Sequence, residues 1–169
     1  MTFPGEAPDE PCPGCGLIAP GGAAGCQAIF DELLARDFSE PLYFRVHRLL
    51  VDTYCLQHPE RYCKSAKSLA AHLVGLCSIL ERGASRAVGE EALRRWLDGK
   101  SPIEKPELPA QRGELTVADV RGAATPEAHA AAVERWARST WQAYSTLHGV
   151  ARQWLEQALA TEPARAGAR

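Results

Sequence analysis

The chain has 169 residues, of which 46% are hydrophobic and 24% charged, and its formal net charge is −2. This length suits one domain with a sizeable core, and the absence of a lysine and arginine stripe argues against nucleic-acid binding. The apolar runs are too short for a transmembrane helix and the N-terminus lacks a secretory signal, so we expect a cytoplasmic protein without membrane contact whose cysteines are reduced.

Residues 1–25 form the first predicted segment, a loop rich in proline and glycine. It carries the sequence CPGCG at residues 12–16, here called the cysteine knuckle. Two thiols, Cys12 and Cys15, on one tight turn are typical of a zinc site. Cys26 is the third candidate ligand, because it begins the first predicted helix and a helix N-terminus favours a thiolate. A redox dithiol is the alternative, although no strand pattern precedes the motif.

Two helices follow the loop. Apolar residues recur every three or four positions from residue 26, and the pattern stops near residues 36–38. Ser39 as N-cap begins a second helix, which Pro59 ends. The short connection makes the two helices antiparallel, so His58 at the end of the second lies beside the start of the first. We therefore predict a zinc site with three cysteines and one histidine: Cys12, Cys15, Cys26 and His58.

The remaining cysteines are Cys55, Cys63 and Cys77. Cys55 and Cys63 flank His58 and would form a rival ligand set in place of Cys26. Free cysteine is among the most frequently buried residue types, so buried thiols are the favoured interpretation for all three.

Further helices are predicted towards the C-terminus. A third helix runs from Ser65 or Ser68 to Gly83, a residue that suits a helix C-terminus. A weaker helix covers residues 88–98 and precedes a proline-rich loop over residues 99–114.

The last predicted helix is the longest. The sequence TPE at residues 125–127 supplies an N-cap, a proline in the first turn and an acid near the positive end of the helix dipole. The helix continues to about residue 160, and the tail 161–169 is predicted to be disordered. The fold class is therefore all-α, a four-helix-bundle-like domain over residues 26–160 on which the N-terminal zinc-knuckle loop packs.

Histidines on separate helices suggest a second metal site inside the bundle. His72 is expected level with Asp52, a carboxylate able to orient a histidine, bind a metal or act as a base. Asp52, His72 and His148 are thus candidate catalytic residues of a metal-dependent hydrolase or transferase, and His47, His72 and His148 are candidate ligands. The alternative is that these histidines only make hydrogen bonds in the core. His129 is expected to be exposed to solvent.

Three tryptophans, Trp136, Trp141 and Trp154, fall on different sides of the last predicted helix. One of them would then face a groove or a neighbouring subunit, which leaves a homodimer open. The favoured alternative is that a long helix packed against several neighbours needs large side chains all round.

Several segments carry a resemblance in combination: CPGCG at 12–16, HRLLVDTYCLQHP at 47–59, SLAAHLVGLCSILERG at 68–83, LTVADV at 115–120 and the helix of Trp136 and Trp141. Together they resemble a family of small bacterial proteins known only as a domain of unknown function, with the knuckle and a VDxYxxQHP segment. The resemblance implies one compact domain from Cys12 to about Trp154 and no assigned reaction. Ten positions match the family's recurring pattern: Cys12, Cys15, Cys26, His47, Asp52, Tyr54, Gln57, His58, His72 and His148. Cys55 and Cys63 are not among them.

The arrangement is also loosely similar to DinB-like metal-dependent bundles, but this chain lacks their HxxxH pair, so that activity is not transferred. From the sequence we expect a zinc-binding helical protein that acts as a binding or regulatory module. A metal-dependent enzyme and a thiol-based redox or metal sensor are the alternatives. The sequence identifies no substrate and no protein or small-molecule partner, and it does not decide whether the protein is an enzyme.

Overall fold

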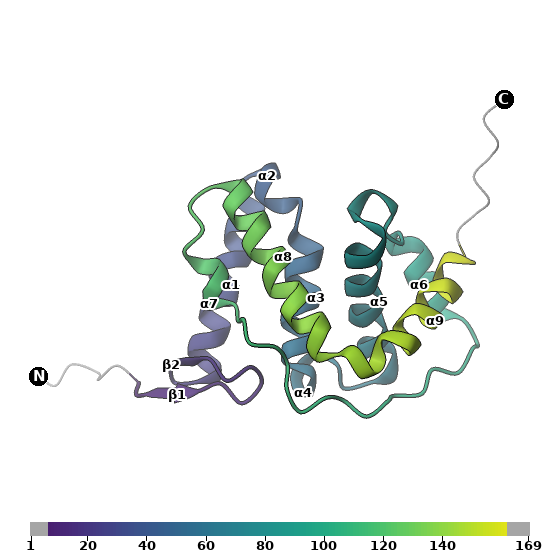
Figure 1. The fold of residues 1–169 in the computed structure, drawn as a ribbon, viewed down its shortest axis with the longest axis horizontal. Coiled ribbons are helices and arrows are strands. Elements are labelled where there is room, and N and C mark those ends of the chain that lie inside the picture. Colours follow the sequence, from purple (N-terminus) through teal and green to yellow (C-terminus); the bar gives the residue numbers. More distant parts are fainter. Residues whose placement is uncertain (1–6, 162–169) are drawn as a thin grey trace, which may run out of the picture.

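The computed structural model describes residues 7–161, and in this part of the chain helices dominate (Figure 1). The predicted helical fold class is confirmed. The first six residues of the predicted loop and almost all of the predicted tail lie outside the described residues.

A small hairpin precedes the helices. Strand β1 (Asp9–Pro11) pairs antiparallel with β2 (Ile18–Pro20), and the cysteine knuckle forms the loop between them. The proline and glycine content of this segment predicts an irregular loop instead. Strands of three residues are too short to show an alternating pattern, so their pairing was not predictable from periodicity.

Helices make up the rest of the fold, and several are short. In chain order the elements are α1 (Ala23–Ser39), α2 (Pro41–Phe44), α3 (His47–Gln57), α4 (Pro59–Tyr62), α5 (Ala66–Arg82), the 3-10 turn η1 (Ala84–Arg86), α6 (Glu90–Asp98), α7 (Ala118–Arg121), α8 (Pro126–Ala143), the 3-10 turn η2 (Ser145–Leu147) and α9 (His148–Leu159). The second predicted helix is thus divided into α2 and α3. The proline-rich segment 99–114 contains no helix or strand, as expected.

The longest predicted helix is interrupted. It ends at Ala143, and the chain bends through η2 before α9 begins at His148. The buried Tyr144 hydroxyl donates to the Leu56 carbonyl at 2.6 Å, which ties the bend to α3. The His148 ring donates through Nε2 to the Trp141 carbonyl at 2.8 Å, near the end of α8. The bend lets α8 pack on α3 while α9 packs on α5 and α6.

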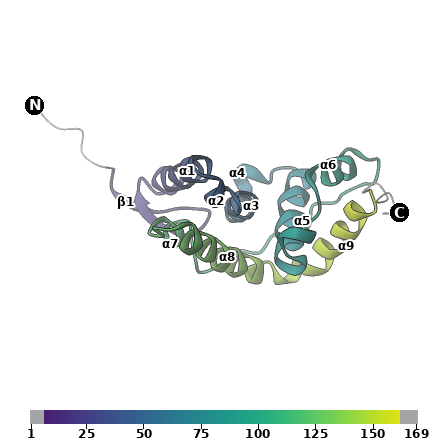
Figure 2. The same ribbon diagram turned by 90° about the horizontal axis from the view of Figure 1, so that it is seen from above.

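The helices lie in two rows. Seen from above, α7, α8 and α9 follow one side, α1, α3 and α6 lie on the other, and α5 stands between α6 and α9 (Figure 2). One continuous hydrophobic core runs through both rows and includes Cys12 and Cys26. Trp136, Trp141 and Trp154 are all buried in it, so the packing interpretation of these side chains is confirmed.

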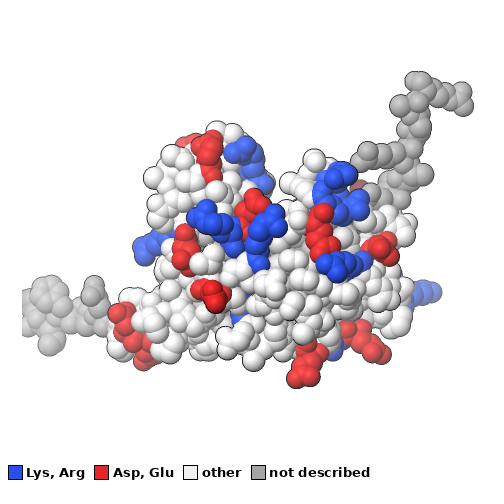
Figure 3. Space-filling view, viewed as in Figure 1, with Lys and Arg blue, Asp and Glu red and all other residues white. Residues whose placement is uncertain are grey.

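The surface is mixed in charge. On the face drawn in Figure 3, acidic and basic side chains are interspersed rather than gathered by sign. Within residues 7–161, every helix is too short or too polar to cross a membrane.

Candidate metal centre

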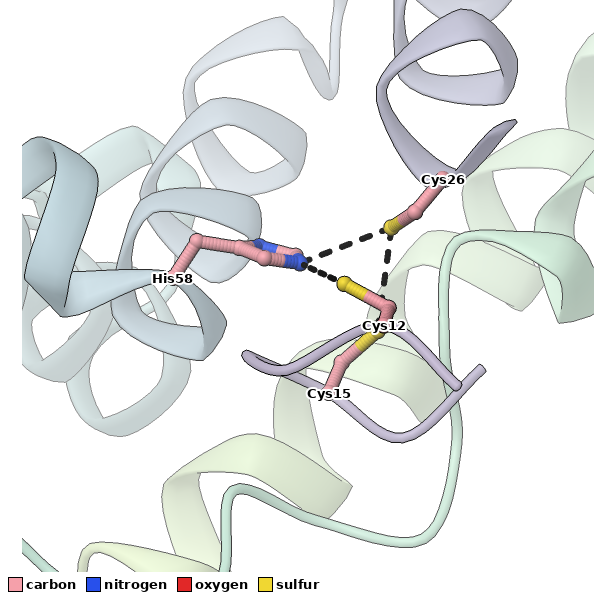
Figure 4. Close-up of side chains that lie close together, drawn as sticks. All are labelled: Cys12, Cys15, Cys26 and His58. Carbon is pink, nitrogen blue, oxygen red and sulfur yellow. Dashed lines mark hydrogen bonds between the residues drawn. The ribbon is translucent and has the colours of Figure 1, made fainter. Parts of the chain in front are cut away.

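Four side chains from three segments meet beside the first turn of α1. Cys12 and Cys15 come from the hairpin loop, Cys26 from α1, and His58 from the residue that follows α3 (Figure 4). Their ligand atoms all lie within 4.8 Å of one another. The predicted proximity of the knuckle, Cys26 and His58 is therefore confirmed.

Three of the separations between ligand atoms match those around a tetrahedral zinc ion. With zinc–sulfur bonds of about 2.3 Å and a zinc–nitrogen bond of about 2.0 Å, two sulfurs stand about 3.8 Å apart and a sulfur and a nitrogen about 3.5 Å apart. The observed separations are 3.7 Å for Cys15 Sγ to Cys26 Sγ, 3.5 Å for Cys12 Sγ to His58 Nε2 and 3.4 Å for Cys26 Sγ to His58 Nε2. All six cysteines are free thiols, so no disulfide competes for these sulfurs.

The knuckle is shaped to lie against His58. The Cys12 amide donates to the Leu17 carbonyl and the Gly16 amide to the Cys12 carbonyl, both at 2.8 Å, which closes the loop into a tight turn. Gly14 then faces the His58 ring so closely that a Cβ atom there would overlap it and would lie 2.9 Å from the Gln57 carbonyl oxygen. Only glycine fits this position without displacing the histidine.

His58 presents one nitrogen to the thiols. Its Nδ1 donates to the Tyr54 carbonyl at 2.7 Å, which leaves Nε2 with the lone pair that a metal needs. The ring also packs on the Tyr54 ring, with centroids 4.0 Å apart. The Tyr54 hydroxyl lies 3.7 Å from Cys26 Sγ and donates to the Gln27 side chain, so the surroundings of the site hold both the histidine and Cys26 in place.

The thiols share their protons unequally. The hydrogen bond with Cys26 and, to a smaller extent, the nearby His58 lower the pKa of Cys15 to about 4, although burial opposes them. The same contact with Cys15, together with burial, raises the pKa of Cys26. Cys12, Cys26 and His58 are buried, whereas Cys15 is half-buried. Cys15 is therefore the thiol of this pair that loses its proton more readily, and a metal ion would displace the remaining thiol protons.

The predicted interior site is not assembled. His72 does pair with Asp52, with 2.9 Å between Nδ1 and Oδ1. This agrees with the prediction that the two residues lie at the same height on adjacent helices. His47 instead pairs with Asp37 at 3.0 Å, and His148 contacts the carbonyl of Trp141 and stacks on its ring. In the described part of the chain, the cluster of Cys12, Cys15, Cys26 and His58 is the one group of three or more such residues close enough to hold an ion.

The expectation that His129 is exposed is wrong. The side chain is fully buried, and its Nε2 donates to Asp37 Oδ1 at 2.9 Å. Asp37 is also fully buried and binds both His129 and His47, which links α8 and α3 to α1. Sequence reasoning missed Asp37, because one acid in the last turn of a helix resembles a surface residue.

The cysteines of the rival ligand set lie outside the cluster. Cys55, Cys63 and Cys77 are buried, and Cys63 Sγ approaches the Cys55 carbonyl at 3.6 Å. Burial raises the pKa of each thiol to about 12, so all three stay protonated and unreactive at neutral pH.

Comparison with known proteins gives one match. Residues 10–145 match a family described as "Family of unknown function (DUF5946)", and this region includes all four residues of the cluster. The curated proteins and the solved structures give no match to the chain.

Proposed function

Because the chain belongs to the family of unknown function DUF5946, whose description names no reaction, we propose a function from the site itself. Cys12, Cys15, Cys26 and His58 hold a structural zinc ion, and the zinc-stapled helical domain acts as a binding or regulatory module in the cytoplasm.

The closed set of four ligands carries this proposal. Structural zinc takes four protein ligands, whereas catalytic zinc keeps one position for water or substrate. Three thiolates and one imidazole would satisfy the ion completely. Soft sulfur ligands in this geometry favour zinc over magnesium, calcium or manganese, which prefer oxygen.

The ion would attach the hairpin to the helices. Of residues 7–20, only Cys12 and Ala19 are buried, and β1 is exposed throughout. Because the hairpin buries little apolar surface, the hydrophobic effect contributes little to holding it in place. Binding of the metal would supply the missing free energy, as in other small zinc-stabilised structures.

A pocket beside the cluster supports a binding role. It has a volume of about 330 Å³ and is lined by residues of the knuckle together with Tyr54, His58, Glu60 and Arg61. A ligand or peptide seated there would contact the metal-held loop directly, so binding would depend on the metal.

Elemental analysis and X-ray absorption of the purified protein test the zinc site. We expect one zinc per chain, with three sulfurs at about 2.3 Å and one nitrogen at about 2.0 Å. Cys15→Ser should lose the metal, whereas Cys77→Ala, a buried thiol outside the cluster, should retain it. A folded, metal-free protein whose stability a chelator does not change would contradict the proposal.

A thiol-based sensor is the second candidate function. It is favoured by the partial exposure of Cys15 and by the 3.7 Å separation of its sulfur from that of Cys26. Mild peroxide should then release zinc and join two of the knuckle and Cys26 thiols in a disulfide that a reductant reverses. Mass spectrometry of the alkylated protein checks this, and an irreversible or absent change excludes the sensor.

A further inference from the structure

A second pocket opens between α3, α5 and α6. It has a volume of about 310 Å³, and it shares no lining residue with the metal centre or with the pocket beside it. Its lining residues are Arg48, Asp52, Ala71, His72, Glu90, Leu93, Arg94, Leu97 and Asp98.

A histidine with a fixed orientation stands in its wall. Asp52 is 6% exposed and accepts the Nδ1 proton of His72 at 2.9 Å. The His72 side chain itself is 22% exposed. The carboxylate therefore sets the orientation and tautomer of the ring and leaves Nε2 for a ligand. Burial of a carboxylate costs free energy. Desolvation raises the pKa of Asp52, although the hydrogen bond with His72 acts in the opposite direction.

Arg48 is held beside this pair. Its Nη1 donates to the Val88 carbonyl at 2.6 Å, and its Nε lies 3.7 Å from Asp52 Oδ2. Arg48 Nη2 and Asp52 Oδ2 are both buried without a hydrogen-bond partner within the described residues. Gly75 of α5 makes room for the group, because a Cβ atom there would overlap the Asp52 carboxylate. The histidine, carboxylate and guanidinium are thus built in before any ligand arrives.

A second guanidinium, that of Arg94, faces the same pocket from α6. The neighbouring Arg95 lies outside the pocket and pairs with Glu91 at 3.6 Å. Arg94 forms no ion pair with any described residue, although Glu90 and Asp98 lie one turn to either side of it. Within residues 7–161 its guanidinium thus has no partner and can bind a ligand.

We propose that this pocket binds the phosphate group of a small phosphomonoester, held by Arg48, His72 and Arg94. Three hydrogen-bonding groups from three helices converge on one small pocket, and arginine suits the paired oxygens of a phosphate. A phosphate near neutral pH carries acceptor oxygens and an exchangeable proton, so it pairs with His72 Nε2 whether that nitrogen donates or accepts.

The rim of the pocket selects the rest of the ligand. Glu90 and Asp98 are exposed carboxylates that repel further negative charge, which excludes nucleic acids and polyphosphates. The same carboxylates accept hydrogen bonds from amino or hydroxyl groups. Leu93 and Leu97 add a short apolar wall, so the remainder of the ligand is small and carries donors.

Nuclear magnetic resonance of the full chain as purified tests the proposal. Inorganic phosphate and phosphoethanolamine are titrated at fixed pH and ionic strength while the ring signals of His72, identified by their loss in His72→Gln, are followed. We expect both probes to move these signals at millimolar concentration, and phosphoethanolamine to bind more tightly because its amino group meets Glu90 and Asp98.

Arg94→Gln should weaken binding of both probes at least about tenfold. Arg95→Gln is the matched control, since Arg95 is adjacent, also exposed and outside the pocket, and binding to this variant should equal that of the wild type. Unmoved His72 signals, or equal losses in the two arginine variants, would overturn the site. Tighter binding of inorganic phosphate than of phosphoethanolamine would overturn the role of the two carboxylates.

Discussion

At the scale of single residues, the geometry of the metal centre requires a residue without a side chain at position 14. Gly14 has no Cβ, and this lets the backbone of the knuckle lie against the His58 ring. The sequence predicted the cysteines of the turn from their spacing. It also predicted His58, because Pro59 ends a helix that runs antiparallel to α1. It did not predict why a glycine must stand at position 14, since that depends on a contact across 44 residues.

Gly14→Ala should therefore weaken the site while it leaves every ligand in place. The added methyl group would push the turn away from His58, and overpacking of this kind costs about 1–3 kcal/mol. We expect lower zinc affinity, measured by competition with a chromophoric chelator, and a lower midpoint of thermal unfolding. Gly149→Ala on α9, where an added Cβ meets nothing within 4 Å, is the control and should bind zinc normally. Equal zinc affinities in the two variants would refute this explanation of the turn.

Asp52 should make the stability depend on pH with a definite sign. Burial raises its pKa above the ordinary value of 3.8, and the His72 hydrogen bond only partly opposes this. A carboxyl group with a raised folded-state pKa contributes stability that is complete below its unfolded pKa and is lost as the pH rises through its folded pKa. The difference in unfolding free energy, wild type minus Asp52→Asn, should therefore fall as the pH rises from the unfolded-state pKa of Asp52 to its folded-state pKa.

Urea unfolding at a series of pH values measures this difference, and Asp98→Asn at the exposed rim serves as the control. A difference that rises with pH would mean that the favourable contacts of the ionised Asp52 outweigh its desolvation.

At the scale of elements, the bend between α8 and α9 determines which helices touch. The apolar pattern continues through the bend, so the sequence predicted one helix from Pro126 to about residue 160. Helix propensity is a weak preference that tertiary contacts override, and here the buried Tyr144 is bound to α3 by its hydroxyl. At the start of α9, His148 contacts the Trp141 carbonyl and stacks on the Trp141 ring, so it does not join the pair of Asp52 and His72.

Tyr144→Phe should weaken the bend. The change leaves the buried Leu56 carbonyl without this donor, which costs about 1–3 kcal/mol. Denaturant unfolding followed by circular dichroism measures the loss. Tyr43→Phe is the matched control: the Tyr43 hydroxyl makes a long 3.4 Å contact with the Ala124 carbonyl at the surface, so we expect a change within about 0.5 kcal/mol. Equal stability of the two variants would show that packing alone forms the bend.

At the scale of the whole molecule, the chain consists of a helical core and an N-terminal hairpin attached at one end. The core cluster connects helices of both rows, whereas the hairpin contributes only Cys12 to it, with Cys15 and Leu17 packed against it. Removal of the metal should consequently act locally before it acts globally.

Treatment with a chelator should release the hairpin and preserve most of the helices. In hydrogen exchange followed by mass spectrometry, the amides of residues 7–26 should lose protection first, including those of Cys12 and Gly16 that close the turn. Peptides from α5 and α9 should keep their protection, and added zinc should restore the hairpin. Simultaneous loss of protection in all helices would instead make the metal essential to the entire fold.

The sequence by itself determined the helical class and the knuckle, because these follow from local signals: apolar spacing and turn residues. It also predicted Cys26 and His58 as the other two ligands, with Cys55 and Cys63 left as a rival set. The tertiary structure alone decided the hairpin, the bend after α8, the burial of His129 on Asp37 and the separation of His47, His72 and His148. Each of these depends on contacts between residues far apart in the chain, and no local pattern records which distant partner a side chain will meet.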